Sequence, residues 1–325
     1  MAFPQTRPRR LRQTPQLRKL IRETELNPAD LVMPFFVRPG RGIRAEIPSL
    51  PGQFQYSMDA LMDAAGMAVQ AGVGAAILFG IPDKKDSLGS GAYAKNGIVQ
   101  EAARRIKKKY PSLCLIADLC LCEYTSHGHC GVLKGDRILN DETLKLYDKT
   151  AVSQAEAGFD VIAPSGMMDG QVSSIRLALD KAGFEMTPIL AYAAKTASAF
   201  YGPFREAVQS TPQFGDRLTH QMDPSNFREA MREISLDVLE GADIVMVKPA
   251  LPCLDLIKGA RDHFDCPIAA YSVSGEYAMI KAASKNGWLD EKKAALELLT
   301  SIKRAGADFI ISYHALSAAQ WLKEK

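Results

Sequence analysis

Long apolar runs and a strong excess of charge of one sign are both missing from this sequence. The longest apolar stretch, around Ala75–Ile81, is far shorter than the ~20 residues that a membrane-spanning helix needs, so we expect no membrane partner. With 40 basic and 37 acidic residues, the formal net charge is only +3 over 325 residues, and we expect no nucleic-acid partner. The succession of charged, apolar and small residues that marks a secretory signal is also missing, which predicts a cytoplasmic protein with six reduced cysteines.

The composition is that of a globular protein with a large core, because 47% of the residues are hydrophobic and 24% are charged. It excludes an intrinsically disordered chain, a collagen and a small disulfide-stabilised scaffold. The length suits either two average domains or a single α/β barrel.

The first 22 residues differ from the rest because they contain no acidic residue. They carry seven basic residues, which are Arg7, Arg9, Arg10, Arg12, Arg18, Lys19 and Arg22. A disordered tail, a transit peptide and an arm that packs on another subunit all fit this composition. Four apolar residues would give an arm something to bury: Leu11, Leu17, Leu20 and Ile21. We assign residues 1–28 to such an arm and residues 29–325 to a catalytic domain.

Eight short runs in the remaining chain are apolar throughout rather than in alternation, as in buried parallel strands. They are Leu31–Val37, Gly74–Gly80, Leu113–Leu119, Phe159–Pro164, Ile189–Ala194, Asp243–Val247, Ile268–Val273 and Phe309–Tyr313. Segments with helical spacing lie between them. We predict one helix over Met58–Val69 with Ser57 as its N-cap, and another over Phe227–Val238, opened by Ser225 and stopped by Gly241.

A helix, then a glycine, then a strand recurs at Gly72, Gly158, Gly183, Gly241 and Gly306. Glycine at this place ends a helix because it accepts the left-handed conformation. Eight strands joined by helices predict a (β/α)₈ barrel, in which the chemistry lies just beyond the carboxyl ends of the strands. A doubly wound open sheet is the alternative, although no complete G-x-G-x-x-G follows a strand.

Cysteines gather at the end of the third predicted strand. Asp118, Cys120 and Cys122 are two residues apart, which in a strand points their side chains the same way, and Cys130 follows after seven residues. Three thiolates can hold a zinc ion and leave a fourth position open, as a catalytic zinc requires. Small buried thiols are the alternative. We do not expect the remaining cysteines and the nearby histidines to bind the metal. Cys114, Cys253 and Cys266 are expected in the core, and His127 and His129 are expected to be solvated in the loop.

Lys195 and Lys248 directly follow the fifth and sixth predicted strands. Burial and a like-charged neighbour both lower the pKa of an amine, and a neutral amine is the nucleophile that forms a Schiff base with a ketone. A lysine that extends its amine to solvent is the alternative for either one alone. Two of them on neighbouring strands favour a reactive pair and indicate carbonyl chemistry.

Anion-binding side chains are expected around the same mouth. The segment Phe200–Asn226 is rich in glycine, proline and aromatic residues, which is typical of a lid. It contains Arg205 and Arg217, and arginine suits bidentate binding of a carboxylate, although exposed arginines in a flexible loop are the alternative. Ser274 and Tyr313 supply hydroxyl groups after the seventh and eighth predicted strands.

Five stretches of the sequence are long and chemically unusual. They are DLCLCEYTSHGHC at Asp118–Cys130, APSGMMD at Ala163–Asp169, YGPFR at Tyr201–Arg205, MVKP at Met246–Pro249 and VSGEY at Val273–Tyr277. Together they closely resemble the porphobilinogen synthase (5-aminolevulinic acid dehydratase) family. The resemblance covers nearly the whole chain. It implies a lyase that condenses two 5-aminolevulinate molecules to porphobilinogen with loss of two waters, on the route to haem and other tetrapyrroles.

The resemblance also implies roles for individual residues. Lys248 would hold the first substrate as a Schiff base and Lys195 the second. The family's zinc ligands match Cys120, Cys122 and Cys130. The residues that bind one substrate carboxylate match Arg205, Arg217 and Gln221, and those that bind the other match Ser274 and Tyr313. The residues that line the family's active site match Asp118, Ser165 and Tyr192. Glu233, on the residues alone a solvated helix acid, matches a position that binds an activating, allosteric Mg²⁺ in many bacterial members. Family members are typically homo-octamers in which the N-terminal arm wraps a neighbour.

Two other functions fit parts of this pattern. A class I aldolase is also a Schiff-base barrel, but it needs only one imine-forming lysine and no zinc. A zinc-stabilised barrel that serves as a binding or scaffold protein needs no reactive lysine. Borohydride trapping with labelled 5-aminolevulinate separates the three functions, because the scaffold takes up no label.

Overall fold

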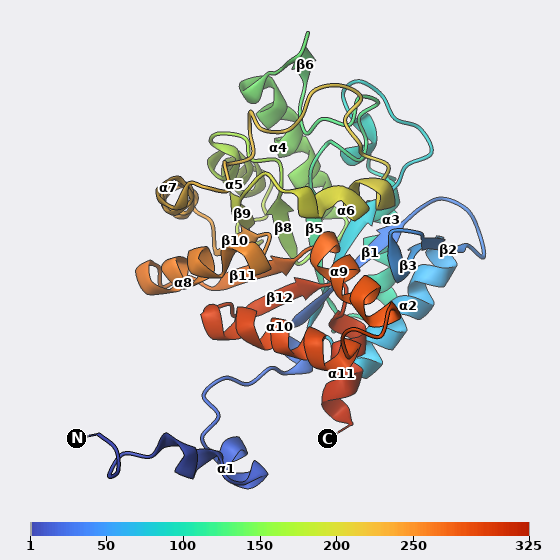
Figure 1. The fold of residues 1–325 in the computed structure, drawn as a ribbon. Coiled ribbons are helices and arrows are strands. Elements are labelled where there is room, and N and C mark those ends of the chain that lie inside the picture. Colours follow the sequence, from blue (N-terminus) through green and yellow to red (C-terminus); the bar gives the residue numbers. More distant parts are fainter. Residues whose placement is uncertain (1, 325) are drawn as a thin grey trace.

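Eight parallel strands close into a barrel in the computed structural model, which describes residues 2–324 (Figure 1). In order around the barrel they are β1 (Leu31–Val37), β4 (Ala75–Gly80), β5 (Cys114–Leu119), β8 (Val161–Pro164), β9 (Leu190–Lys195), β10 (Ile244–Lys248), β11 (Ile268–Ser272) and β12 (Phe309–Ser312). β12 pairs with β1, and the N–H of Ile162 donates to the carbonyl of Pro188 at 3.0 Å between β8 and β9. The predicted barrel is therefore confirmed. A doubly wound sheet is excluded, because the strands follow one another in chain order without a switch point.

Helices cover the outside of the barrel (Figure 1). They are α2 (Met58–Ala71), α3 (Ile98–Lys109), α4 (Asn140–Glu156), α5 (Gln171–Lys181), α7 (Phe227–Leu239), α8 (Leu254–His263), α9 (Ser274–Lys285), α10 (Glu291–Ala305) and α11 (Ala315–Lys323). Gly72 ends α2 in the left-handed conformation, as predicted. Helix α7 begins at Phe227 as predicted, but its N-cap is Asn226 rather than Ser225, whose hydroxyl bonds to Asp223 instead.

Two short hairpins were not predicted. β2 (Arg44–Ile47) and β3 (Leu50–Tyr56) form one, and β3 also pairs with the end of β1. β6 (Leu133–Lys134) and β7 (Arg137–Ile138) form the other. The exposed strands of these hairpins carry charged residues and no apolar run, so the hydrophobic pattern that revealed the barrel strands gives no signal here.

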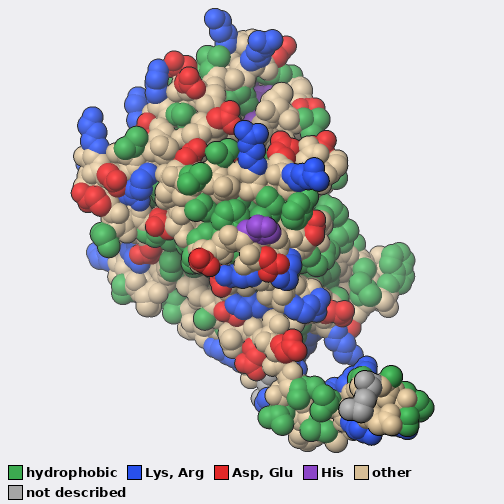
Figure 2. All heavy atoms as spheres, turned by 90° about the vertical axis from the view of Figure 1, so that its left-hand side faces the viewer, with side chains coloured by type: hydrophobic (Ala, Val, Ile, Leu, Met, Phe, Trp, Pro, Cys, Tyr) green, Lys and Arg blue, Asp and Glu red, His purple; other side chains and the backbone are tan. Residues whose placement is uncertain are grey.

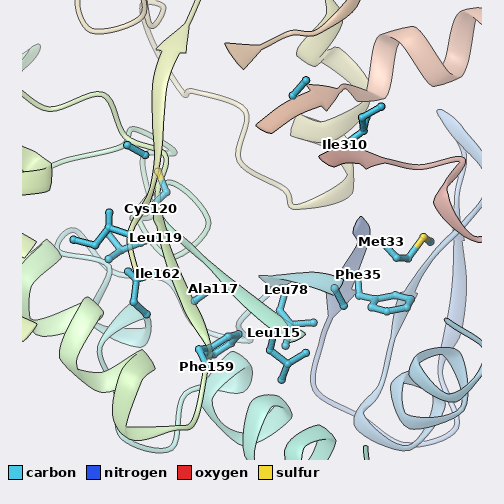
Figure 3. Close-up of a cluster of buried hydrophobic side chains, with 14 of the residues drawn as sticks. Met33, Phe35, Leu78, Leu115, Ala117, Leu119, Cys120, Phe159, Ile162 and Ile310 are labelled. Carbon is cyan, nitrogen blue, oxygen red and sulfur yellow. The ribbon is translucent and has the colours of Figure 1, made fainter. Parts of the chain in front are cut away.

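Alternate residues of each strand face two different cores. One core lies between the strands and the helices, and Figure 3 shows Phe35, Leu78 and Leu115 within it. The other lies inside the barrel and takes residues from all eight strands, including Ile116 and Met246. Since side chains alternate along a strand, Asp118 and Lys248 continue the inward rows of Ile116 and Met246 to the carboxyl end of the barrel.

Residues 2–21 stand away from the barrel, whereas the chain just before β1 rejoins it, with Leu26 buried in the outer core (Figures 1 and 2). Residues 2–21 contain a 3₁₀ turn at Pro8–Arg12 and the short helix α1 (Pro15–Leu20). Their apolar side chains are exposed, Leu11 by 52% and Leu20 by 80%. Contact of this segment with another subunit stays a prediction. No helix within residues 2–324 is both long enough and apolar enough to cross a membrane.

Candidate active site

Lys195 and Lys248 lie side by side in the mouth of the barrel, because they are paired residues of β9 and β10. A bulge makes this possible. Val245 pairs with Ala191 and Val247 with Ala194, so two steps along β10 match three along β9. The extra residue on β9 turns Lys195 inward, where Lys248 already lies in the inward row of β10, and both lysines are buried. The prediction that the two lysines lie next to each other on neighbouring strands is confirmed.

Aromatic rings surround the Lys248 amine. Its Nζ lies 4.3 Å from the ring centre of Tyr271 and 5.2 Å from those of Tyr192, Tyr201 and Phe204. Burial lowers the pKa of Lys248 to about 7, and the positive charge of Lys195 acts in the same direction. A large share of this amine is therefore neutral, and so nucleophilic, near pH 7.

Asp118, Ser165 and Tyr192, all predicted to line the site, lie around the two amines. The Lys195 amine donates to the backbone carbonyl of Ser165, and the Ser165 hydroxyl donates to Asp118 Oδ2 at 3.1 Å. Burial raises the pKa of Asp118 to about 6, against the opposing effect of the two lysines. The Tyr192 ring centre is 5.5 Å from Lys195 Nζ. A carboxyl group that can change protonation near neutral pH thus interacts electrostatically with both amines and is linked to Lys195 through Ser165.

The three predicted cysteines converge on one point just beyond β5. The sulfurs of Cys120, Cys122 and Cys130 lie within 4.8 Å of one another, all three residues are buried, and the Sγ atoms of Cys120 and Cys122 are 3.4 Å apart. Hydrogen bonds from the two other thiols hold the pKa of Cys130 well below its usual range. β5 ends at Leu119, so the turn that follows it, rather than strand alternation, brings Cys120 and Cys122 together.

The predicted lid lies across the mouth. It begins with a 3₁₀ turn at Ala199–Tyr201 and the helix α6 (Gly202–Ala207), and then runs without regular structure to α7. Arg205, Arg217 and Gln221 line a cavity of about 330 Å³. Among the described residues, the Nε atoms of both arginines and the Gln221 amide are buried without a hydrogen-bond partner. Unpartnered buried donors of this kind suit a bound anion.

The other predicted hydroxyl groups follow the ends of β11 and β12. Ser274 begins α9; its hydroxyl donates to the carbonyl of Phe200 and accepts from the N–H of Phe204, both at 3.0 Å. Ser274 therefore holds the start of the lid in this conformation. The Tyr313 hydroxyl is buried 3.2 Å from that of Tyr271. Neither group reaches the arginine cavity.

Glu233 is half-buried on α7, away from the lysines. It lines a cavity of about 620 Å³ together with Asp169 and Glu229. Burial raises the pKa of Glu233, and these two neighbouring acids raise it further. The cavity also includes Gln221 of the lid, so it borders the site.

Sequence reasoning missed the aromatic wall around Lys248. Tyr271 shares the inward row of Ala269 on β11, so the alternation of that strand could have revealed it. Tyr201 and Phe204 come from the lid, and no spacing rule predicts which way lid rings point. It also missed Glu123, a buried acid whose carboxylate accepts from the N–H of Gly80.

The fold and this site define an α/β-barrel protein with a pair of buried amines beside a thiol cluster at the mouth of the barrel. The family model for Delta-aminolevulinic acid dehydratase matches residues 5–321. The chain is 58% identical to the Delta-aminolevulinic acid dehydratase of Synechococcus elongatus, over 98% of this chain and 99% of that one. It is 54% identical to that of Bacillus subtilis, over 98% of both chains.

A solved structure agrees with these relatives. The delta-aminolevulinic acid dehydratase (porphobilinogen synthase) of Toxoplasma gondii, in complex with the reaction product porphobilinogen, superposes with a TM-score of 0.96 at 44% identity. The match covers 98% of this chain and 92% of that one. The chain belongs to the delta-aminolevulinic acid dehydratase family and is therefore a lyase.

The coupling of the two amines predicts a pH dependence. Reductive methylation of Lys248 should rise as the pH passes about 7, because only the neutral amine reacts. Lys195→Met removes the neighbouring positive charge, so the pKa of Lys248 should rise and the curve should move to higher pH. Lys195→Arg keeps the charge and is the control. Peptide mass spectrometry at each pH measures the extent of modification, and a curve that Lys195→Met leaves in place would contradict the coupling.

Proposed function

We propose that this protein condenses two molecules of 5-aminolevulinate to porphobilinogen, releasing two waters, and that each substrate is held as a Schiff base on a lysine. The observation that carries this proposal is the pair of buried lysines at matched positions of β9 and β10. In each imine-forming step a neutral amine attacks the substrate ketone, and the carbonyl oxygen leaves as water. A class I aldolase needs one such lysine, whereas this mouth holds two.

Lys248 is assigned the first substrate, because its lowered pKa leaves the amine free to attack. Lys195 is assigned the second. Asp118 interacts electrostatically with both amines, and with a pKa of about 6 its carboxyl group can take up and return a proton as each imine forms. Ser165 orients that carboxyl group through its hydroxyl.

Two groups of anion-binding residues would keep the substrates apart. Arg205, Arg217 and Gln221 have unpartnered buried atoms beside their cavity and are assigned one substrate carboxylate. Ser274 and Tyr313 are assigned the other. The Ser274 proton now points to the carbonyl of Phe200, so this hydroxyl must turn before it donates to a carboxylate. Binding there would therefore move the start of the lid.

The thiol cluster supports a zinc site. Three buried sulfurs within 4.8 Å of one another have the donor type and number of a catalytic zinc with an open fourth position. Cys120, Cys122 and Cys130 would hold the ion. When bound, zinc supplies Lewis-acid polarisation or acidifies a bound water.

Replacing each of the two lysines should affect imine formation differently. We expect Lys248→Ala to lose turnover and to lose the imine at the first site. Lys195→Ala should also lose turnover, by a factor of at least 10³, but keep one trappable imine per chain. Borohydride trapping of labelled 5-aminolevulinate followed by peptide mapping measures both. A near-normal rate in either variant would exclude a mechanism with two imines.

Removal of one thiol should remove the metal. We expect Cys122→Ala to lose one zinc per active site and most of the activity, because two thiolates hold zinc far less tightly than three. Cys253→Ala, which removes a buried thiol outside the cluster, is the matched control. Metal analysis and the rate of porphobilinogen formation check both variants. Full activity in metal-free protein would show that the cluster is only part of the core.

We further propose that Glu233 binds an activating, allosteric Mg²⁺ and that the N-terminal arm packs on a neighbour in a homo-octamer. Glu233, Asp169 and Glu229 share one cavity, and Mg²⁺ binds through few direct ligands and keeps several waters. The exposed apolar side chains of residues 8–21 support a role of the arm in assembly.

Mg²⁺ should then raise both the rate and the share of large oligomers, even at saturating zinc, because it favours the assembly that completes its site. Glu233→Ala should lose this response and keep its zinc and its imine chemistry, whereas Glu185→Ala, at an exposed acid elsewhere, should keep the response. Sedimentation and rate measurements with and without Mg²⁺ check this. The same response in Glu233→Ala and the unmodified protein would show that Glu233 does not hold the ion.

A further inference from the structure

The loop between Cys122 and Cys130 contacts the lid through its histidines. His129, expected from the sequence to be solvated, is only 4% exposed. Its Nε2 lies 3.1 Å from the carbonyl oxygen of Phe214, and the two rings lie 4.7 Å apart between centres. The expectation that His129 is solvated is therefore wrong, because the lid covers this loop.

Further hydrogen bonds join the same two segments. The N–H of Gln213 donates to the carbonyl of His127 at 3.2 Å, and its side-chain amide donates to that of Ser126 at 2.8 Å. Arg217 Nη2 donates to the carbonyl of Gly128 at 2.9 Å. A Cβ at Gly128 would lie 2.7 Å from the carbonyl oxygen of Thr211, so only glycine allows the two backbones to approach this closely.

The histidines do not join the thiol cluster. Within residues 2–324, the three sulfurs are the only set of three or more His, Cys, Asp or Glu ligand atoms that all lie within 4.8 Å of one another, and neither histidine belongs to it. His129 Nε2 is already bonded to the lid, and His127 Nδ1 accepts from the N–H of His129 at 3.1 Å. The polar groups of this loop are therefore used to hold the lid and to shape the loop.

We propose that residues 126–130 form a latch that holds the lid closed, with His129 as a positioning residue. His129 is adjacent to Cys130, so a shift of that thiol moves the latch with it. A metal that fixes the three thiols would then favour the closed lid, and a closed lid would favour metal binding by the same factor, since coupling between two sites is reciprocal. The coupling to metal rests on the proposed zinc site, whereas the latch does not.

Hydrogen exchange of the lid amides at residues 209–217 tests the latch directly. In metal-free protein we expect His129→Leu to lower their protection about fivefold, the factor for one lost hydrogen bond. His129→Gln should restore most of it, because the Gln amide nitrogen can take the place of Nε2. His263→Leu, at an exposed histidine of α8, is the matched control and should change nothing.

The same variants test the coupling. With zinc bound, protection of residues 209–217 should rise in the unmodified protein, and His129→Leu should weaken both that rise and the zinc affinity by about fivefold. The KM for 5-aminolevulinate should rise more than kcat falls. In cobalt-loaded protein the thiolate-to-metal absorption should stay unchanged, because the ligands are unchanged.

Unchanged lid exchange in His129→Leu would overturn the proposal. So would an altered cobalt spectrum with a loss of metal affinity above a hundredfold and normal lid exchange, since His129 would then be a ligand. Should His129→Leu fail to fold, Gln213→Ala removes another latch bond from an exposed side chain and carries the same expectations. The proposed function can fail separately. If the variants loosen the lid but the unmodified protein does not act on 5-aminolevulinate, the proposed function is refuted and the latch is still supported.

Discussion

The arrangement of this site depends on keeping two amines close together out of water. Like charges at matched positions of adjacent strands repel, and burial removes the solvent that would screen them. Lys248 meets this constraint with a pKa lowered to about 7, whereas Lys195 is bonded to the carbonyl of Ser165. The pair is stable at neutral pH because one amine can be uncharged. That uncharged state is also the one that attacks a ketone.

The surrounding residues maintain this low-dielectric mouth. Rings from β9, β11 and the lid surround the Lys248 amine, so the lid contributes to the wall as well as to the cover. The lid in turn is held at two places: Ser274 bonds its first turn, and the loop that ends at Cys130 bonds its middle. Closing the mouth excludes water, which would protect the proposed imines from hydrolysis.

Much of the architecture could be read from local pattern. The eight apolar runs correspond to the eight barrel strands with ends displaced by at most two residues, and the glycines after the helices have positive φ. The placement of chemistry at strand ends led to Asp118, Lys195, Lys248 and the cysteines, and the structure brings these together. Hairpins with exposed strands and the N-cap residue of α7 could not be placed, since neither depends on a hydrophobic run.

The order of apolar segments by itself determined the barrel, because burial of continuous apolar strands under amphipathic helices has few solutions. It also determined which residues could be reactive, by their place after a strand. Only the tertiary structure decided whether their side chains point into the barrel or away from it. Strict alternation from Tyr192 would turn Lys195 outward, and a bulge whose register depends on the neighbouring strand turns it inward. Likewise, whether His129 meets solvent or Phe214 depends on where a lid 85 residues away along the chain comes to rest, and no local spacing contains that information.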